Sequence, residues 1–170
     1  MRYHDITKDD MLNGDGLRVV FWVAGCTHRC HNCQNPVTWD INGGLPFDDA
    51  AKEEIFGELR KDYISGITLS GGDPMHPQHR AEIFELAKEI REKFPTKTIW
   101  SYTGFLWEEL QNESGMKYID VLIDGEFKEE LLNTKLHWVG SSNQRIIDVQ
   151  KTLESGKICL WEDITATAEV

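Results

Sequence analysis

The sequence is short of proline, of basic residues and of long apolar runs, and each shortage excludes a class of protein. Only 5 prolines and 14 glycines among 170 residues, of which 40% are hydrophobic, exclude a collagen-like repeat and a disordered chain. Lys and Arg number 18 against 29 Asp and Glu, so the net charge of -11 repels a phosphate backbone and we expect no nucleic-acid partner. The longest apolar run, residues 19–24, cannot cross a bilayer, and the first ten residues lack the apolar core of a signal peptide. We therefore expect a cytoplasmic protein without a membrane partner.

Cysteine is also scarce, but three of the four cysteines stand close together. Cys26, Cys30 and Cys33 have the spacing Cys-x3-Cys-x2-Cys, and Cys159 lies far from them. In a reducing compartment such clustering indicates metal or redox chemistry more than disulfides. Three thiolates from one loop can converge on zinc or on an iron–sulfur cluster, because soft sulfur ligands select both.

The cysteine pattern alone leaves both centres open. A structural zinc site would take His28 or His31 as its fourth ligand, although such sites usually draw their ligands from two separated pairs. Cys159 stands between two apolar residues, where a cysteine is more often a buried small hydrophobic residue than a distant ligand. An iron–sulfur cluster with three cysteines would leave one iron for a substrate, whereas electron-transfer clusters normally have four.

Strand and helix patterns alternate along the chain. Strands are predicted over residues 17–24, 66–69, 98–102 and 118–123, with short ones near 145–149 and 157–160, and helices over 47–63, 78–94 and 105–112. This alternation predicts an α/β fold with right-handed crossovers and a mainly parallel sheet. A closed eight-stranded barrel takes about 250 residues, so we expect an open or partial barrel of roughly five or six strands in one domain, residues 1–170.

A chemically distinctive turn follows each of the four main predicted strands. These turns begin at Cys26, at Gly71-Gly72-Asp73, at Tyr102-Thr103-Gly104 and at Asp124-Gly125. In parallel α/β folds the ligand lies at the carboxyl ends of the strands, where the loops are free of packing. We therefore expect all four turns on one rim.

The cysteine motif after a first strand, followed by a Gly-Gly-acid turn after the second, resembles the radical S-adenosylmethionine (SAM) superfamily. Further segments resemble the family of anaerobic ribonucleoside-triphosphate reductase activating proteins, which are glycyl-radical-enzyme activases. These segments are residues 13–18, 25–33, 35–39, 67–74, 119–125 and 140–145. The resemblance spans nearly the whole chain, and it implies a partial, open TIM-like (β/α)6 barrel of the radical SAM type.

The resemblance also implies cofactors, a reaction and partners. Cys26, Cys30 and Cys33 would hold one 4Fe–4S cluster per chain, and SAM would bind the iron that lacks a cysteine. Reductive cleavage would give methionine and a 5'-deoxyadenosyl radical, which would take a hydrogen atom from a glycine on the large subunit of the anaerobic reductase. An electron donor such as a flavodoxin or ferredoxin would be a second partner. No side chain is expected to act as a catalytic acid or base.

SAM-binding positions follow from the same resemblance. They are Asn32, Cys33, Gln34, Gly71, Gly72 and Asp73. The first three would lie beside the adenine, although relatives often carry aromatic residues on either side of the last cysteine. The two glycines would let the backbone approach the methionyl amine closely, or would form a plain turn before Pro74. Asp73 would contact that amine or cap the turn that follows.

Other charged residues have two open interpretations each. His28, Arg29 and His31 would attract the methionyl carboxylate or raise the potential of the cluster, whereas most charged loop residues are simply solvated. Arg145 would bind a ligand carboxylate or the partner, or would form a structural salt bridge. Asp124 would be a site residue or an ordinary turn residue.

The leading function is thus a radical-generating activase of the anaerobic reductase. One alternative is an activase of another glycyl-radical enzyme, such as pyruvate formate-lyase, although such relatives usually have longer chains. Others are a non-catalytic zinc-binding module and a radical enzyme that acts on a small molecule.

Overall fold

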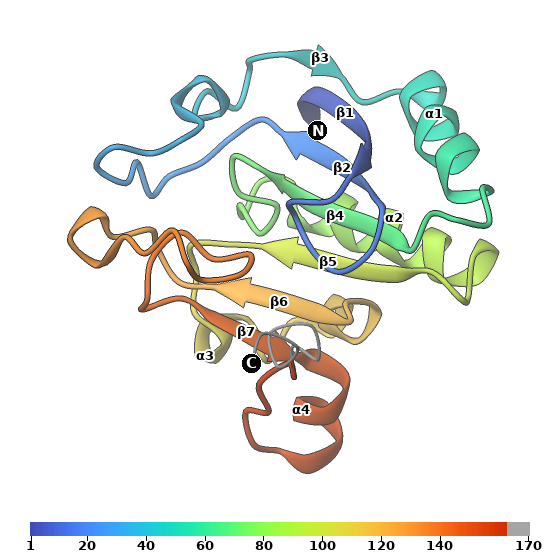
Figure 1. The fold of residues 1–170 in the computed structure, drawn as a ribbon. Coiled ribbons are helices and arrows are strands. Elements are labelled where there is room, and N and C mark those ends of the chain that lie inside the picture. Colours follow the sequence, from blue (N-terminus) through green and yellow to red (C-terminus); the bar gives the residue numbers. More distant parts are fainter. Residues whose placement is uncertain (163–170) are drawn as a thin grey trace.

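The computed structural model describes residues 1–162, which fold around one open sheet (Figure 1). Its strands are β1 (Arg2–Asp10), β2 (Arg18–Val23), β3 (Leu45–Pro46), β4 (Gly66–Gly71), β5 (Thr98–Tyr102), β6 (Val121–Asp124) and β7 (Arg145–Asp148). The helices are α1 (Asp49–Leu59), α2 (Arg80–Lys93), α3 (Trp107–Leu110) and α4 (Val149–Ser155). Short 3-10 turns are η1 (Pro36–Thr38), η2 (Ser114–Tyr118) and η3 (Glu129–Leu131).

The sheet is parallel at its centre and antiparallel at its edges. Its order is β3-β1-β2-β4-β5-β6-β7, and β2, β4, β5 and β6 run parallel. The predicted α/β fold is confirmed. In residues 1–162, however, the sheet is an open one of seven strands, of which four run parallel, where a mainly parallel open barrel of five or six strands was expected. Neither β1 nor β3 was predicted. β1 was not predicted because it is largely polar, with Ile6 as its one buried residue. Such a pattern is usual for an antiparallel strand near the edge of a sheet.

Both long helices begin later than predicted. A polar residue, Asp48 or His79, directly precedes each helix, and its side-chain hydrogen bond fixes where the helix starts. Asp48 accepts a hydrogen bond from the Ala51 amide (2.9 Å) and caps α1, which therefore starts at Asp49 and not at Phe47. His79 directly precedes α2, and its Nε2 donates a hydrogen bond to the Asp73 carbonyl (2.7 Å). The residues before Arg80 therefore form a turn. The predicted strand at 157–160 is an isolated bridge between Leu160 and Ile147.

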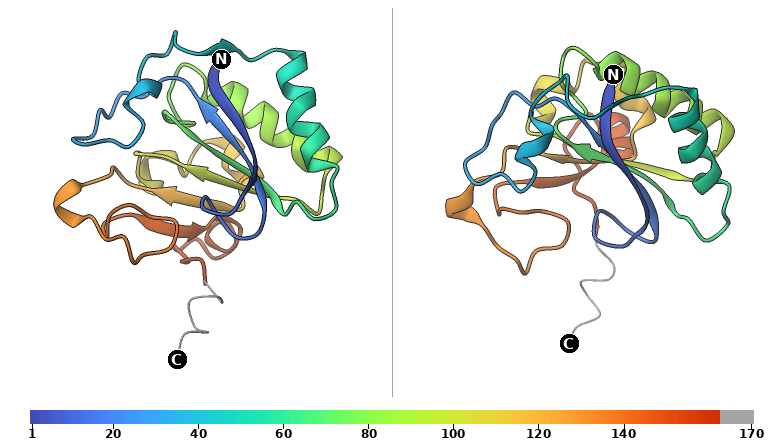
Figure 2. Two further views of the ribbon diagram at one scale, coloured as in Figure 1. Left: turned by 45° about the horizontal axis from the view of Figure 1, so that its top comes forward. Right: turned by 90° about the horizontal axis from the view of Figure 1, so that it is seen from above.

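The two faces of the sheet carry different side chains. On one face, alternate residues of each parallel strand, such as Val19, Phe21 and Leu69, pack in the main core under α1 and α2 (Figure 2). On the other face Trp100 packs edge-on against Trp138 at 5.0 Å, and Tyr102 donates to the Trp138 carbonyl (2.7 Å). The loop between β6 and β7 therefore covers part of the second face. Within the described residues, no helix has both the length and the apolar character needed to span a membrane.

A buried arginine joins the amino ends of the parallel strands. Arg18 is fully buried, and its guanidinium donates to the Thr68 hydroxyl (2.8 Å) and to the Thr98 carbonyl (3.0 Å) and hydroxyl (2.9 Å). It also donates to the Ile67 carbonyl (2.8 Å) and lies 5.2 Å from the Trp100 ring. Burial lowers the pKa of Arg18 to about 10, which leaves it charged at neutral pH. Its forked shape matches acceptors on β4 and β5 together.

Replacing this fork with a single ammonium should destabilise the fold. In Arg18→Lys several buried acceptors would lose their donor, and we expect the free energy of unfolding to fall by about 2–4 kcal/mol. Urea denaturation measures this loss. Arg60→Lys is the matched control, because Arg60 pairs with Glu53 on the surface and its side chain is 55% exposed. Equal losses in the two variants would contradict the role given to Arg18.

Candidate functional site

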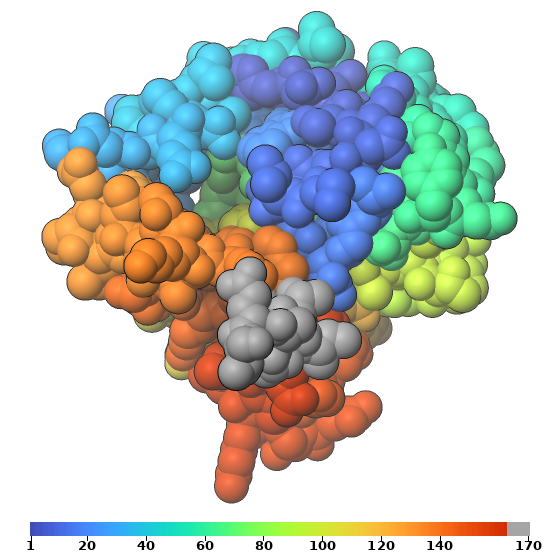
Figure 3. All heavy atoms as spheres, in the orientation of Figure 1, coloured from blue at the N-terminus to red at the C-terminus, as the bar shows by residue number. Residues whose placement is uncertain are grey.

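A cavity of about 220 Å³ lies where the parallel strands end. Residues that follow each of the four strands line it: Cys26, Gly72, Thr103 and Gly125. Figure 3 looks into a hollow between the light-blue loop that carries the cysteines, the dark-blue amino-terminal strands and the orange loop after β6. The prediction that the four turns share one rim is confirmed.

Cys26, Cys30 and Cys33 all line this cavity as free, half-buried thiols. Burial raises the pKa of the Cys26 and Cys30 thiols, so a bound cation would be needed to favour their thiolates. In residues 1–162 no three His, Cys, Asp or Glu side chains form a group compact enough to hold a single metal ion. Three thiols on the lining of one cavity offer the soft donors that zinc and iron–sulfur clusters both select.

The fourth ligands considered for zinc are poorly placed for it. The His31 side chain is 84% exposed and does not line the cavity, and both ring nitrogens of His28 face carboxylates. Cys159 is not among the residues that line the cavity, and its Sγ donates to the Lys157 carbonyl (3.4 Å). Cys159 is thus no distant ligand of this cavity, as expected, but it is half-buried after α4 and not fully buried as predicted.

Asp73 is buried at the end of β4, and its carboxylate has partners on all sides. Oδ1 accepts from the Met75 amide (2.8 Å), which caps the following turn as one interpretation required. Oδ2 accepts from the Gly104 amide (3.0 Å) and the Thr103 hydroxyl (3.1 Å). His28 Nε2 also lies 2.9 Å from Oδ2, close enough for an ion pair although not aligned as a hydrogen bond. This carboxylate therefore joins the β4 and β5 turns.

The two glycines before Asp73 allow backbones to pack against each other. Gly71 has φ +104°, and a Cβ at Gly72 would lie 2.4 Å from the Gly25 carbonyl oxygen. The Asp73 amide donates to that same oxygen (2.7 Å). The β4 turn thus touches the start of the cysteine loop, residues 25–34, which a plain turn would not require.

His28 is the main site residue whose position the sequence did not reveal. Its side chain is only 10% exposed, and its ring packs edge-on against Phe105 at 4.6 Å. The interaction with Asp73, opposed by burial and aided by Glu126, raises the pKa of His28 to about 9, so the ring is charged at neutral pH. The expectation of a solvated side chain is wrong for His28 and holds for the exposed His31 and Arg29.

Arg145 and Asp124 form a structural salt bridge. Asp124 is fully buried at the end of β6 and accepts from Arg145 Nε (3.0 Å) and from the Trp107 amide (2.8 Å). The Arg145 fork also reaches both carboxylate oxygens of Glu108, at 3.1 and 2.8 Å. Hydrogen bonds to Asp124 and Glu108 raise the pKa of Arg145 above its usual value. The salt-bridge interpretation of Arg145 is confirmed, and Asp124 serves as its buried partner.

The residues expected beside the adenine take different positions. Cys33 and Gln34 line the cavity, whereas the Asn32 side chain donates to Glu129 (2.6 Å). Gln144 also lines the cavity and was not predicted as a site residue. Its amide donates to the Gly125 carbonyl (3.0 Å), so it supports the loop after β6; the unusual segment at 140–145 was the only sequence signal for it.

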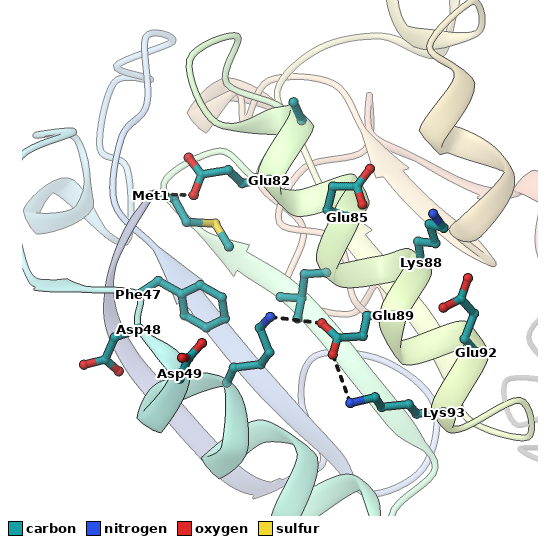
Figure 4. Close-up of a pocket in the computed structure, with 13 residues that line it drawn as sticks. Met1, Phe47, Asp48, Asp49, Glu82, Glu85, Lys88, Glu89, Glu92 and Lys93 are labelled. Carbon is teal, nitrogen blue, oxygen red and sulfur yellow. Dashed lines mark hydrogen bonds and ion pairs between the residues drawn. The ribbon is translucent and has the colours of Figure 1, made fainter.

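A larger hollow of about 800 Å³ lies between α1 and α2, away from the cysteines. Figure 4 shows its charged lining, in which Glu89 pairs with Lys93 and with Lys52, each at 3.0 Å. The amino terminus of the chain pairs with Glu82 at its edge. No thiol lines this hollow, and none of the turns at the carboxyl ends of the parallel strands reaches it, so the smaller cavity is the candidate site.

Comparison with known proteins agrees with the geometry of the cavity. A family model described as "4Fe-4S single cluster domain" matches residues 12–147. Proteins named anaerobic ribonucleoside-triphosphate reductase-activating protein are similar to the chain along most of its length. The relative from Enterobacteria phage T4 is 43% identical over 146 residues, which cover 86% of this chain and 93% of the relative. The chain belongs to this family.

Two further members of the activating-protein family show the same extent of similarity. The relative from Escherichia coli K12 is 43% identical over 149 residues, covering 85% of this chain and 96% of its own length. The relative from Haemophilus influenzae is 39% identical over 150 residues, covering 86% and 97%. The family resemblance read from the sequence is thereby confirmed. The region matched by the family model contains the cysteine loop, the β4 turn and Gln144.

A methyl group at Gly72 should separate the β4 turn from the cysteine loop. Gly72→Ala would place Cβ against two backbone oxygens, of Gly25 and Thr38 (2.4 and 2.8 Å), which cannot move aside as a flexible side chain would. We expect the free energy of unfolding to fall by about 2–4 kcal/mol, by the overpacking and backbone mechanisms. Urea denaturation measures the fall.

Gly57→Ala is the control for that substitution. Nothing lies within 4 Å of a Cβ at Gly57, which is inside α1, so the change should stabilise the helix by about 0.5–1 kcal/mol. A Gly72→Ala variant as stable as the wild type would refute the close contact between the turn and the loop.

Proposed function

We propose that this chain cleaves SAM reductively and generates a glycyl radical on the large subunit of anaerobic ribonucleoside-triphosphate reductase. The observation that carries the proposal is the cavity itself. Three free thiols and a Gly-Gly-Asp turn line one wall at the carboxyl ends of four parallel strands, in a chain of the activating-protein family.

Three cysteines on the lining of one cavity support a 4Fe–4S cluster by their number and their soft sulfur chemistry. Cys26, Cys30 and Cys33 would hold it, and three ligands would leave one iron for the amino and carboxylate groups of SAM. When bound, the cluster supplies the single electron that cleaves SAM to methionine and a 5'-deoxyadenosyl radical, which removes a hydrogen atom from the target glycine.

The chain's own residues would bind and orient SAM. The backbone at Gly71 and Gly72, which line the cavity, would accept a hydrogen bond from the methionyl amine. Gln34 and Cys33, both on the cavity wall, would lie beside the adenine, with Asn32 next to them in sequence. Asp73 would act on the amine mainly through the turn that it caps. A walled cavity would also keep water away from the radical.

In fold, we propose that the four parallel strands are the partial TIM-like barrel of the radical SAM type. Helices α1 and α2 cover one face of these strands, and the cavity opens at their carboxyl ends, as in barrel enzymes. The relatives' names favour the anaerobic reductase over pyruvate formate-lyase as the partner. A flavodoxin or ferredoxin would supply the electron, in the cytoplasm.

Anaerobic reconstitution tests the cofactor chemistry. The full chain is loaded with iron and sulfide, both are quantified, and methionine and 5'-deoxyadenosine are assayed after addition of SAM and dithionite. We expect both products from the wild type and neither from Cys30→Ala. Cys159→Ala is the matched control and should behave as the wild type, because Cys159 lies outside the cavity. One tightly bound zinc and no cleavage would refute the proposal.

The partner is tested by where the radical appears. The reconstituted chain is reduced with dithionite and incubated with SAM, together with either the large reductase subunit or pyruvate formate-lyase. Electron paramagnetic resonance (EPR) should then show the doublet of a glycyl radical only with the reductase. A signal with pyruvate formate-lyase alone would assign the chain to the other activase class, while the SAM chemistry would stand.

A further inference from the structure

The cysteine loop has little structure of its own. It is irregular over residues 25–34, and Arg29 and Asn32 take the left-handed conformation, with φ +48° and +53°. The backbone hydrogen bond inside it runs from the Cys33 amide to the Cys30 carbonyl (3.1 Å). Contacts with the rest of the chain must therefore set its shape.

His28 supplies contacts to the ends of three different strands. Its Nε2 faces Asp73 after β4 (2.9 Å), and its Nδ1 lies 2.7 Å from Glu126 after β6. Between them its ring packs on Phe105 after β5. His31 in the same loop is, by contrast, 84% exposed.

The surroundings of His28 are shaped to receive it. A Cβ at Gly104 would lie 2.5 Å from the His28 ring, so the glycine leaves the space that the imidazole occupies. Asp73 is itself immobilised by the Gly104 amide and the Thr103 hydroxyl. On the outer side, Asn143 donates to the Glu126 carbonyl (2.8 Å) and holds that residue against the ring.

We propose that His28 is a positioning residue, which fixes the cysteine loop against the Asp73 turn and so sets the placement of SAM relative to the cluster. This inference rests on the proposed function for the identity of the two groups. Asp73 follows the glycines that would receive the methionyl amine, and His28 lies between two cluster ligands in sequence. The contact between them therefore joins the two halves of the site.

His28→Ala removes the contact and leaves all three cysteines in place. In the full chain, hydrogen–deuterium exchange of the hydrogen-bonded amides of the loop, those of Gly25, Cys26 and Cys33, should become about tenfold faster, because the loop loses its anchor. After reconstitution we expect iron content near that of the wild type. The change in the EPR spectrum of the reduced cluster on addition of SAM should be weakened, and SAM cleavage should slow by about tenfold or more, as for a misplaced reactant.

Two conservative variants separate positioning from mere bulk. In His28→Gln the side-chain amide reaches the place of Nε2 and puts an N–H group beside Asp73, whereas in His28→Asn it reaches only the place of Nδ1, beside Glu126. We expect the glutamine variant to recover most of the SAM-dependent EPR change and the asparagine variant to recover little. His31→Ala is the matched control from the same loop and should resemble the wild type.

The outcomes distinguish this inference from the proposed function. Unchanged exchange in His28→Ala, or fast exchange with a normal SAM-dependent spectrum and rate, would overturn the positioning role. Wild-type protein that forms no cluster would instead refute the proposed function, and the exchange rates would still decide whether His28 anchors the loop. If His28→Ala is unstable, Gly104→Ala gives the same test, because a Cβ there would lie 2.5 Å from the His28 ring and so displaces it from Asp73.

Discussion

A buried carboxylate at the end of β4 determines how the site is assembled. Asp73 is 1% exposed, and a charge so deeply buried is tolerated only with hydrogen-bond and ionic partners. Those partners come from its own turn, from the β5 turn and, through His28, from the cysteine loop. Because the carboxylate must keep them, segments about 30 and 45 residues apart in sequence are held at one point. The position of the thiols in the cavity follows from that constraint.

A second buried charge constrains the opposite end of the same strands. Arg18 lies at the amino end of β2, opposite Gly66 of β4, and Val23 at the other end lies opposite Gly71. The two charges lie at opposite ends of the strands and do not neutralise each other, so each needs hydrogen-bond partners in its own surroundings. A slip of one residue between β2 and β4 would turn Arg18 toward the apolar core and move the glycines away from the cysteine loop. The register is therefore fixed at both ends, which makes the rim a rigid support for a cofactor.

The sequence predicted those parts of the structure that depend on near neighbours. Apolar residues three or four positions apart located α1 and α2. Runs of β-branched residues located the four parallel strands and hence the rim. β1 was missed because a polar strand with Ile6 as its one buried residue has no periodic signal. Long-range pairing was missed for another reason: His28 meets Glu126 across 98 positions, and no local pattern says which charges will meet. Arg145 could thus be read as a ligand-binding residue or as part of a salt bridge until Asp124 and Glu108 were seen around it.

The two sides of the cavity therefore differ in how firmly they hold the cysteine loop. On the side of the sheet, the cysteine loop is held by a buried carboxylate and by backbone contacts at Gly72, which cannot be broken without exposing or unpairing a charge. On the side of the β6–β7 loop it is held by Glu126 and Glu129, whose side chains are 51% and 44% exposed. Exposed ion pairs contribute little to stability and weaken with salt. The contacts with Glu126 and Glu129 can therefore break while the thiols keep their place. A cavity needs this difference if it must hold a reactive group still and also admit a large substrate.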